Sequence, residues 1–193
     1  IATGTSMRDF SRTLTKEKEP GTYMHYVSIN TQVLGFLLQE VTNRSISEYL
    51  YEKIWNPLGM EDSAYFILDD VEDELALGGI YANLRDYAKF GLLYLQNGVW
   101  NGERLISEKW IDFVRTPAPA TEDIGSMYGG QWWLVPDDRN DVPKEAYATN
   151  GSRGQYTIVV PTHDLVLVRR GLDYGRQGFD RWGLTREVIK AIN

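Results

Sequence analysis

A hydroxyl-rich stretch near the start of the chain offers groups that could transfer a proton. It runs from Thr22 to Thr31 and contains Tyr26 and Ser28. A tyrosine phenol, with a pKa ordinarily about 10, can act as a base when a lysine ammonium beside it stabilises the phenolate. A serine hydroxyl is a weak nucleophile until such a base accepts its proton. Small hydroxyl residues are also favoured as helix caps, so both interpretations of this stretch stay open.

Other kinds of catalytic site find little support in the sequence. Cysteine is absent, which excludes disulfides, thiolate ligands and a cysteine nucleophile. The two histidines, His25 and His163, form no paired-histidine zinc motif. The nearest match to a Gly-x-Ser-x-Gly nucleophile turn, residues 150–154, begins with Asn150 instead of glycine. No glycine-rich phosphate loop is present, and we predict neither a metal nor another cofactor.

Composition indicates a globular protein. The chain has 193 residues, of which 42% are hydrophobic and 24% charged. Its net charge of −7 disfavours nucleic acid and anionic membranes as partners, and no apolar run approaches the roughly 20 residues of a membrane span. We expect a soluble protein, for which bacterial cytoplasm and periplasm are both open. The chain begins at Ile1, so we expect a processed or truncated piece.

Local patterns predict the elements that would position the candidate residues. A largely buried helix is expected over residues 31–42, with Val33, Leu37 and Val41 on one stripe. Residues 1–22 read as irregular, and the acidic run 69–74 as a solvated loop. Capping patterns at Ser45 and Ser107 begin two further helices. Other predicted elements are helices at about 84–96 and 183–192 and strands at 63–68, 131–135, 146–149, 156–160 and 165–169. Helices first and strands later indicate an α+β fold, with helices packed on an antiparallel sheet.

Several short motifs follow one another along nearly the whole chain. They are residues 19–22 (Glu-Pro-Gly-Thr), 26–35 (Tyr-Val-Ser-Ile-Asn-Thr-Gln-Val-Leu-Gly), 57–60 (Pro-Leu-Gly-Met), 78–79 (Gly-Gly), 85–91 (Arg-Asp-Tyr-Ala-Lys-Phe-Gly), 101–106 (Asn-Gly-Glu-Arg-Leu-Ile), 131–133 (Gln-Trp-Trp) and 151–161 (Gly-Ser-Arg-Gly-Gln-Tyr-Thr-Ile-Val-Val-Pro). In this order, they resemble the C-terminal part of the serine β-lactamase and penicillin-recognising superfamily. The resemblance is greatest to its class C-like esterase and 6-aminohexanoate-dimer hydrolase branch.

The resemblance implies a β-lactamase-like fold and a serine hydrolase that cleaves a small-molecule amide, ester or β-lactam-like substrate through an acyl-enzyme. It also implies a set of catalytic roles. Tyr26 would accept the proton of the nucleophilic serine, and Ser28 would help to hold the Lys-Ser-Tyr hydrogen-bond network. Gly151 would leave room for the acyl group, and the backbone N–H of Ser152 would form half of the oxyanion hole. The whole chain, 1–193, would be the C-terminal part of one hydrolase domain. Its helical part would span roughly 23–116, and its strands and terminal helix roughly 130–193.

The third motif departs from the family pattern. Many relatives have lysine or histidine there, whereas this chain reads Thr149-Asn150-Gly151. Recognition of a substrate carboxylate would then rest on Arg153 or be absent, which favours esterase or amidase chemistry over β-lactamase activity. Trp132 and Trp133 are candidates for lining the substrate cleft, with packing in the core as the alternative.

The family nucleophile, Ser-x-x-Lys, is missing from the sequence. None of the nine serines is followed three residues later by lysine. The resemblance therefore implies that an N-terminal segment or a companion chain supplies the nucleophile, and that this chain alone is inactive and poorly soluble. An inactive relative that serves in binding or assembly is the alternative.

Overall fold

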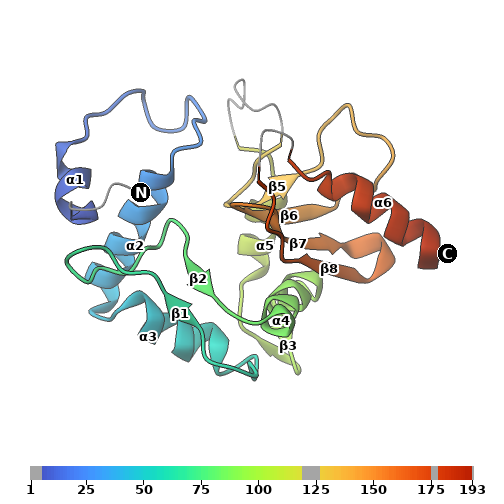
Figure 1. Cartoon of the computed structure of the whole chain (residues 1–193), viewed down its shortest axis with the longest axis horizontal. Helices are drawn as coiled ribbons and strands as arrows, with labels where there is room; N and C mark the ends of the chain where they lie inside the picture. Colours follow the sequence, from blue (N-terminus) through green and yellow to red (C-terminus); the bar gives the residue numbers. More distant parts are fainter. Residues whose placement is uncertain (1–5, 119–126, 175–177, 193) are drawn as a thin grey trace. The chain divides into compact units, whose positions relative to one another are not determined.

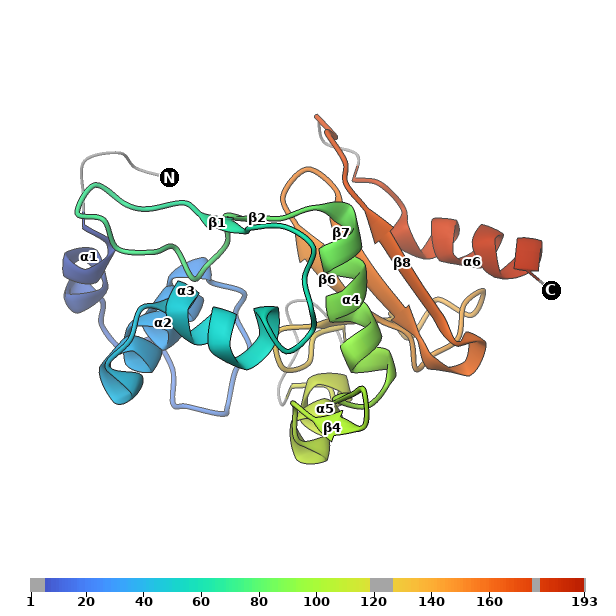
Figure 2. The same cartoon turned by 90° about the horizontal axis from the view of Figure 1, so that it is seen from below.

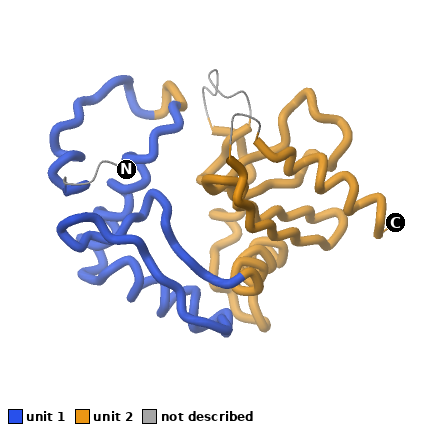
Figure 3. The backbone as a smooth tube through the Cα atoms, viewed as in Figure 1, with its two compact units in different colours: residues 1–20, 25–83 blue, residues 21–24, 84–193 orange. Residues whose placement is uncertain are grey.

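The computed structural model describes residues 6–118, 127–174 and 178–192 (Figures 1 and 2). The chain forms two compact units (Figure 3). Unit 1 comprises Ile1–Pro20 and His25–Asn83, and unit 2 comprises Gly21–Met24 and Leu84–Asn193. The boundary thus falls at residue 83, and the helices that follow it belong to the same unit as the main sheet. Within the described residues, no helix combines the length and apolar character needed to cross a bilayer.

Unit 1 is a small helical assembly with one short β-ribbon. Its helices are α1 (Met7–Thr13), α2 (Ser28–Thr42) and α3 (Ile46–Leu50), and α3 continues into a π-helical turn at Tyr51–Trp55. The ribbon pairs β1 (Tyr65–Phe66) with β2 (Ile80–Tyr81) in antiparallel fashion. The predicted second helix is confirmed, because α3 and the π-turn together end before Pro57. The predicted strand at 63–68 is reduced to two residues.

Helix α1 was not expected, since residues 1–22 read as irregular. Ser6 caps it by accepting a hydrogen bond from Asp9 N at 3.2 Å. The guanidinium of Arg8 lies 4.3 Å from the centre of the Phe36 ring on α2 and donates to Asp73 at 3.3 Å. These contacts beyond the helix itself stabilise a segment whose own sequence is polar.

Helix α2 differs from its prediction in start and in burial. It begins at Ser28, three residues earlier than expected, and its buried residues are Gln32, Gly35 and Phe36. The stripe expected in the core is exposed instead, with 56% of Leu37 and 71% of Val41 accessible, and Leu34 beside it is also exposed. Close approach to Ala76 explains the buried face, because a Cβ at Gly35 would overlap that side chain.

The acidic run at 69–74 was predicted to be a solvated loop, but two of its carboxylates bind the protein backbone. Asp69 accepts backbone hydrogen bonds from Met7, Val71 and Asp73 at 2.9–3.0 Å. The carboxylate of Glu74 accepts from the backbone N–H of Ile46 at 2.6 Å, at the positive end of α3. These carboxylates therefore hold the loop against the helices.

Unit 2 contains a four-stranded antiparallel sheet in the order β5-β6-β7-β8. The strands are β5 (Trp133–Leu134), β6 (Tyr147–Gly151), β7 (Gln155–Val160) and β8 (Leu165–Arg169). Three helices, α4 (Leu84–Leu95), α5 (Glu108–Arg115) and α6 (Arg181–Ile192), accompany the sheet, together with a ribbon of β3 (Val99–Trp100) and β4 (Glu103–Arg104). The hairpin predicted at 156–169 is confirmed, with a 3-10 turn at Pro161–His163.

Each face of the sheet carries its own apolar core. Tyr147 and Val159 face a cluster completed by Tyr94 of α4 and Ile111 and Val114 of α5. Residues of the opposite face pack against Trp182 and Ile189 of α6; they are Val135, Ala146, Ala148, Tyr156, Ile158, Val160, Leu165 and Leu167. Helices α4 and α6 lie on opposite sides of the sheet (Figure 1). The α+β class with helices on an antiparallel sheet is confirmed.

Candidate active site

The predicted proton acceptor lies at a loop-to-helix junction in unit 1. Tyr26 is in the loop that leads into α2, and 48% of the residue is exposed. Ser28 is the first residue of the helix and is also exposed. Val27 occupies the N-cap position with extended backbone, φ −127° and ψ 113°, and without a side-chain cap. The capping role considered for Ser28 is therefore wrong, whereas the accessibility that a proton-transfer role requires is present.

The predicted third motif lies at the end of β6 in unit 2. Gly151 is the last residue of β6 and pairs with Gln155 of β7 across a turn of Ser152, Arg153 and Gly154. A Cβ at Gly151 would lie 2.9 Å from the Cβ of Gln155, so glycine is needed here for packing alone. Ser152 and Arg153 are exposed at the tip of this hairpin. The backbone proposed for the oxyanion hole is thus on a tight turn that solvent reaches.

Arg153 is placed by an aromatic side chain that the sequence did not single out. Its guanidinium lies 5.0 Å from the centre of the Tyr174 ring, and Nη1 donates to the Tyr174 hydroxyl at 3.4 Å. A cation stacked on an exposed aromatic ring keeps its outer N–H groups available to an anionic group. Arg153 therefore has the position and chemistry to contact a carboxylate near the turn.

The two tryptophans lie on opposite faces of the sheet. Trp132 is 3% exposed and packs among Phe90, Tyr94 and Tyr147, with ring centres 4.5–6.1 Å away. This burial favours the core-packing alternative for Trp132. Trp133 is half-buried and meets the ring of Tyr128 edge-on at 5.1 Å.

Arg181, which lies beside Trp133, was not identified from the sequence. The guanidinium of Arg181 lies 5.7 Å from the Trp133 ring and 5.8 Å from the Tyr156 ring. Among the described residues its Nε is buried without a hydrogen-bond partner, and burial lowers the pKa of Arg181. An arginine at the first position of a helix gives no sequence signal of such an environment, because the surrounding rings come from distant strands.

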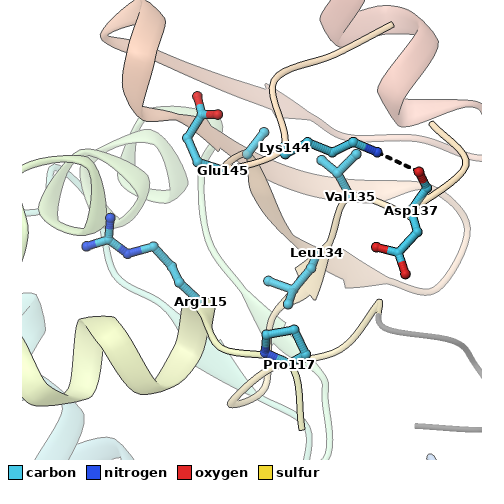
Figure 4. A pocket seen from close by; sticks show the side chains of 8 residues that line it. Arg115, Pro117, Leu134, Val135, Asp137, Lys144 and Glu145 are labelled. Carbon is cyan, nitrogen blue, oxygen red and sulfur yellow. Dashed lines mark hydrogen bonds between the residues drawn. The ribbon is translucent and has the colours of Figure 1, made fainter. Parts of the chain in front are cut away.

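A shallow pocket of about 460 Å³ also lies in unit 2, but it contains none of the predicted site residues (Figure 4). Its charged groups are held by the protein: Lys144 Nζ donates to the carbonyls of Pro136 and Asp137, and Arg115 donates to Asn97 Oδ1. Within the part of the chain that the structure describes, no three His, Asp or Glu side chains gather as metal ligands would. The predicted site residues therefore lie in two segments that are described separately, Tyr26 and Ser28 in unit 1 and residues 151–153 in unit 2.

Comparison with known protein families gives a match over most of the chain. The Beta-lactamase family model matches residues 2–169, which include Tyr26 and the turn after Gly151. The 6-aminohexanoate-dimer hydrolase of Paenarthrobacter ureafaciens is 29% identical over 170 residues, covering 83% of this chain and 42% of that protein. Beta-lactamase-like protein 2 of Dictyostelium discoideum is 23% identical, covering 71% of this chain and 29% of that protein.

Solved structures show the same fold. A Bacillus anthracis protein provisionally described as a 6-aminohexanoate-dimer hydrolase aligns with a TM-score of 0.77 at 23% identity, covering 96% of this chain and 47% of that one. A family VIII carboxylesterase aligns with a TM-score of 0.70 at 18% identity, covering 91% of this chain and 59% of that one. This chain thus spans less than half of the length of the curated relatives named above. The match over residues 2–169 and these alignments confirm the predicted resemblance, and the chain belongs to the Beta-lactamase family of serine hydrolases.

Proposed function

We propose that this chain is the C-terminal part of a serine hydrolase that cleaves a small amide or ester through an acyl-enzyme. The observation that carries the proposal is the family match over residues 2–169, since it spans both segments of the candidate site. The exposure of Tyr26 and of the turn at Ser152 further supports it, because substrate must reach both.

The proposed chemistry has two steps. Tyr26 accepts the proton of a serine hydroxyl as that oxygen attacks the substrate carbonyl, and Ser28 helps to orient the hydrogen bonds around it. The backbone N–H of Ser152 stabilises the oxyanion of the tetrahedral intermediate, and Gly151 leaves space for the acyl group. Tyr26 then returns the proton to the leaving amine or alcohol. Water hydrolyses the resulting ester by the same route in reverse order.

The nucleophilic serine and its lysine come, in this proposal, from an N-terminal segment of a longer protein or from a companion chain. No serine of this chain stands three residues before a lysine. The exposed apolar stripe of α2, formed by Val33, Leu34, Leu37 and Val41, supports this view. Full burial of such a side chain contributes roughly 1.5–3 kcal/mol, and these four are already partly buried, so covering each contributes a fraction of that value. The stripe therefore favours the binding of another segment. The chain alone is inactive in this proposal.

The third motif favours amides and ordinary esters over β-lactams. Thr149 and Asn150 stand where many relatives have a cation, and Arg153 is the nearby basic side chain in the sequence. A substrate with a carboxylate close to its scissile bond would find the guanidinium beside Tyr174. Trp133 is retained as a second contact for substrate, since its ring is not fully buried.

An alternative function is favoured by the missing Ser-x-x-Lys motif itself. A family member that has lost the nucleophile could keep the fold for binding or assembly. Such a protein would still hold a ligand beside Arg153, but it would form no covalent intermediate.

Labelling of the full-length protein, or of this chain together with its companion, separates the two functions. We expect a serine-reactive acylating probe to label the assembly, and Tyr26→Phe to slow labelling by about 100-fold or more, because a general base is lost. Tyr51→Phe is the control, since Tyr51 is also exposed, at 60% against 48% for Tyr26, and has no proposed role. Labelling that Tyr26→Phe leaves unchanged removes Tyr26 from the mechanism. An assembly that is never labelled favours the binding function.

A further inference from the structure

The turn that carries Ser152 has an uncommon backbone conformation. Arg153 has a φ of 62° and Gly154 a φ of 81°, so two successive residues are left-handed. A non-glycine residue adopts this conformation rarely, and it persists only where the surrounding structure holds it.

Arg169, the last residue of β8, binds the turn directly. Its Nη1 donates to the carbonyl of Gly154 at 2.8 Å and to Asp173 Oδ2 at 2.8 Å, while Nη2 donates to Asp173 Oδ1 at 2.7 Å. The pairing with Asp173 is therefore bidentate, the geometry in which an arginine–carboxylate pair is strongest and most directional. Only 23% of the Arg169 side chain and 28% of the Asp173 side chain are exposed. Phe179 lies under the guanidinium, with its ring centre 3.8 Å away.

A second set of bonds links the same turn to the loop after β8. The backbone N–H of Asp173 donates to the carbonyl of Arg153 at 3.1 Å. The side-chain amide of Gln155 donates to the carbonyl of Gly171. Both left-handed residues thus have their carbonyls bound by the Arg169–Asp173 pair, one by the side chain of Arg169 and one by the backbone of Asp173.

Two glycines leave the space in which this arrangement fits. A Cβ at Gly154 would overlap both Asp173 Oδ2 and Arg169 Nη1, and a Cβ at Gly171 would overlap Arg169 Nη1. The guanidinium is therefore enclosed between two glycine backbones and the Phe179 ring. Such packing fixes one position for the arginine and, through it, one conformation for the turn.

We propose that the Arg169–Asp173 ion pair positions the Ser152 backbone N–H as an oxyanion-hole donor by locking the turn that follows β6. This inference rests on the proposed function, since it assigns to the pair a task in acyl transfer. Arg169 and Asp173 touch neither substrate nor nucleophile in it, and they are positioning residues. A donor that is already oriented needs no reorganisation when the oxyanion forms. Loss of this orientation should therefore destabilise the transition state more than it weakens substrate binding.

The test measures acylation by p-nitrophenyl acetate in the full-length protein or in the assembly with the companion chain. For Arg169→Met we expect the acylation rate constant to fall by about 10- to 100-fold, with KM changed by less than about threefold. Arg169→Lys restores only part of the rate, because a single ammonium cannot make the bidentate pair. Arg170→Met is the control: it removes the neighbouring arginine, whose guanidinium lies 4.7 Å from the ring of Tyr87 in α4.

A purely structural role would produce a different pattern. In that case Arg169→Met would lower the melting temperature and the amount of active protein, while the protein that remains folded would acylate at the wild-type rate. Asp173→Asn keeps the shape of the side chain and serves if Arg169→Met does not fold. Wild-type rates in both folded variants overturn the inference and leave the proposed function intact. Absence of acylation in the wild-type protein overturns the proposed function, and the inference falls with it.

Discussion

The phenol of Tyr147 in β6 donates a hydrogen bond to the backbone carbonyl of Tyr94 in α4, with the two oxygens 3.1 Å apart. Both residues are buried, at 0% and 6% exposure, and burial raises the pKa of each phenol above its ordinary value. The bond therefore joins the main sheet to a covering helix inside the core.

Replacing Tyr147 by phenylalanine tests how much this hydrogen bond contributes to stability. We expect the free energy of unfolding to fall by about 1 kcal/mol, since the variant keeps the packing of the ring and loses one buried hydrogen bond. Urea denaturation followed by tryptophan fluorescence measures the change. Tyr51→Phe, at an exposed position, provides the comparison. Equal losses in the two variants would show that the Tyr147–Tyr94 bond adds nothing to stability.

Gln32 is a fully buried polar residue in unit 1 and carries a second prediction. Its Nε2 donates to the carbonyl of Glu74 at 2.9 Å, and its Oε1 accepts from Leu77 N at 3.3 Å. Gln32→Leu would leave both backbone groups without their partner, which costs about 2 kcal/mol or more in unfolding free energy. Gln39→Leu, on the same helix, is expected to cost less, because Gln39 binds the side chain of Arg8 nearer the surface. Urea denaturation of both variants measures the two losses, and an equal loss at Gln39 would contradict the prediction.

Gly91 sets how closely α4 approaches the sheet. A Cβ at this position would lie 2.7 Å from Val166 Cγ1 and 2.8 Å from Thr157 Cγ2. We expect Gly91→Ala to destabilise the protein by about 1–3 kcal/mol through overpacking, although alanine is the better helix former. A methyl group at Gly178 meets no atom of the described residues within 4 Å, so Gly178→Ala should be nearly neutral. Thermal unfolding of the two variants measures the difference, and a neutral Gly91→Ala would show that the helix moves to accommodate the methyl group.

The ion-pair network around Arg139 predicts how stability depends on pH. Hydrogen bonds from Arg139 at 2.7 Å and Arg186 at 2.8 Å lower the pKa of Asp141 to about 2. In the unfolded chain this carboxyl titrates at about 3.9, so its stabilisation is complete above that value and is lost as the pH falls towards 2. Asp141→Asn should therefore cost stability at about pH 6 and little at about pH 2.

Urea unfolding of wild type and Asp141→Asn across this pH range supplies the measurement. Asp138→Asn, at an exposed position in the same loop, is the control. A difference between wild type and Asp141→Asn that stays constant with pH would contradict the assignment.

The sequence predicted those elements whose signals are local. The capping box at Ser45 forms as expected, and Ser107 caps α5 by accepting from Trp110 N at 3.2 Å. The β7–β8 hairpin follows from two runs of β-branched residues joined by a short turn. Helix α1 was not predicted, because Arg8 stabilises it through contacts with Phe36 and Asp73, which lie far along the chain. The exposure of the α2 stripe was not predicted, because apolar periodicity identifies a face but not the partner that covers it.

The candidate site divides in the same way. Motif order indicated the positions of Tyr26 and Gly151, whose roles remain predictions. The sequence did not reveal Arg169 and Asp173, since their relation to Gly154 depends on the conformation of a turn and on the pairing of two strands. Trp132 and Trp133 are adjacent in sequence and have the same side chain. Their different burial, full for Trp132 and partial for Trp133, depends on the side of the sheet that each faces.

A side chain at Gly154 would overlap both members of the Arg169–Asp173 pair, so we expect these three positions to change together among natural relatives. A larger residue at 154 becomes tolerable only after the ion pair has gone, and loss of the pair removes a reason to keep glycine. Natural relatives should therefore fall into two groups, one with all three residues and one that has exchanged all three, and few sequences should be found between them.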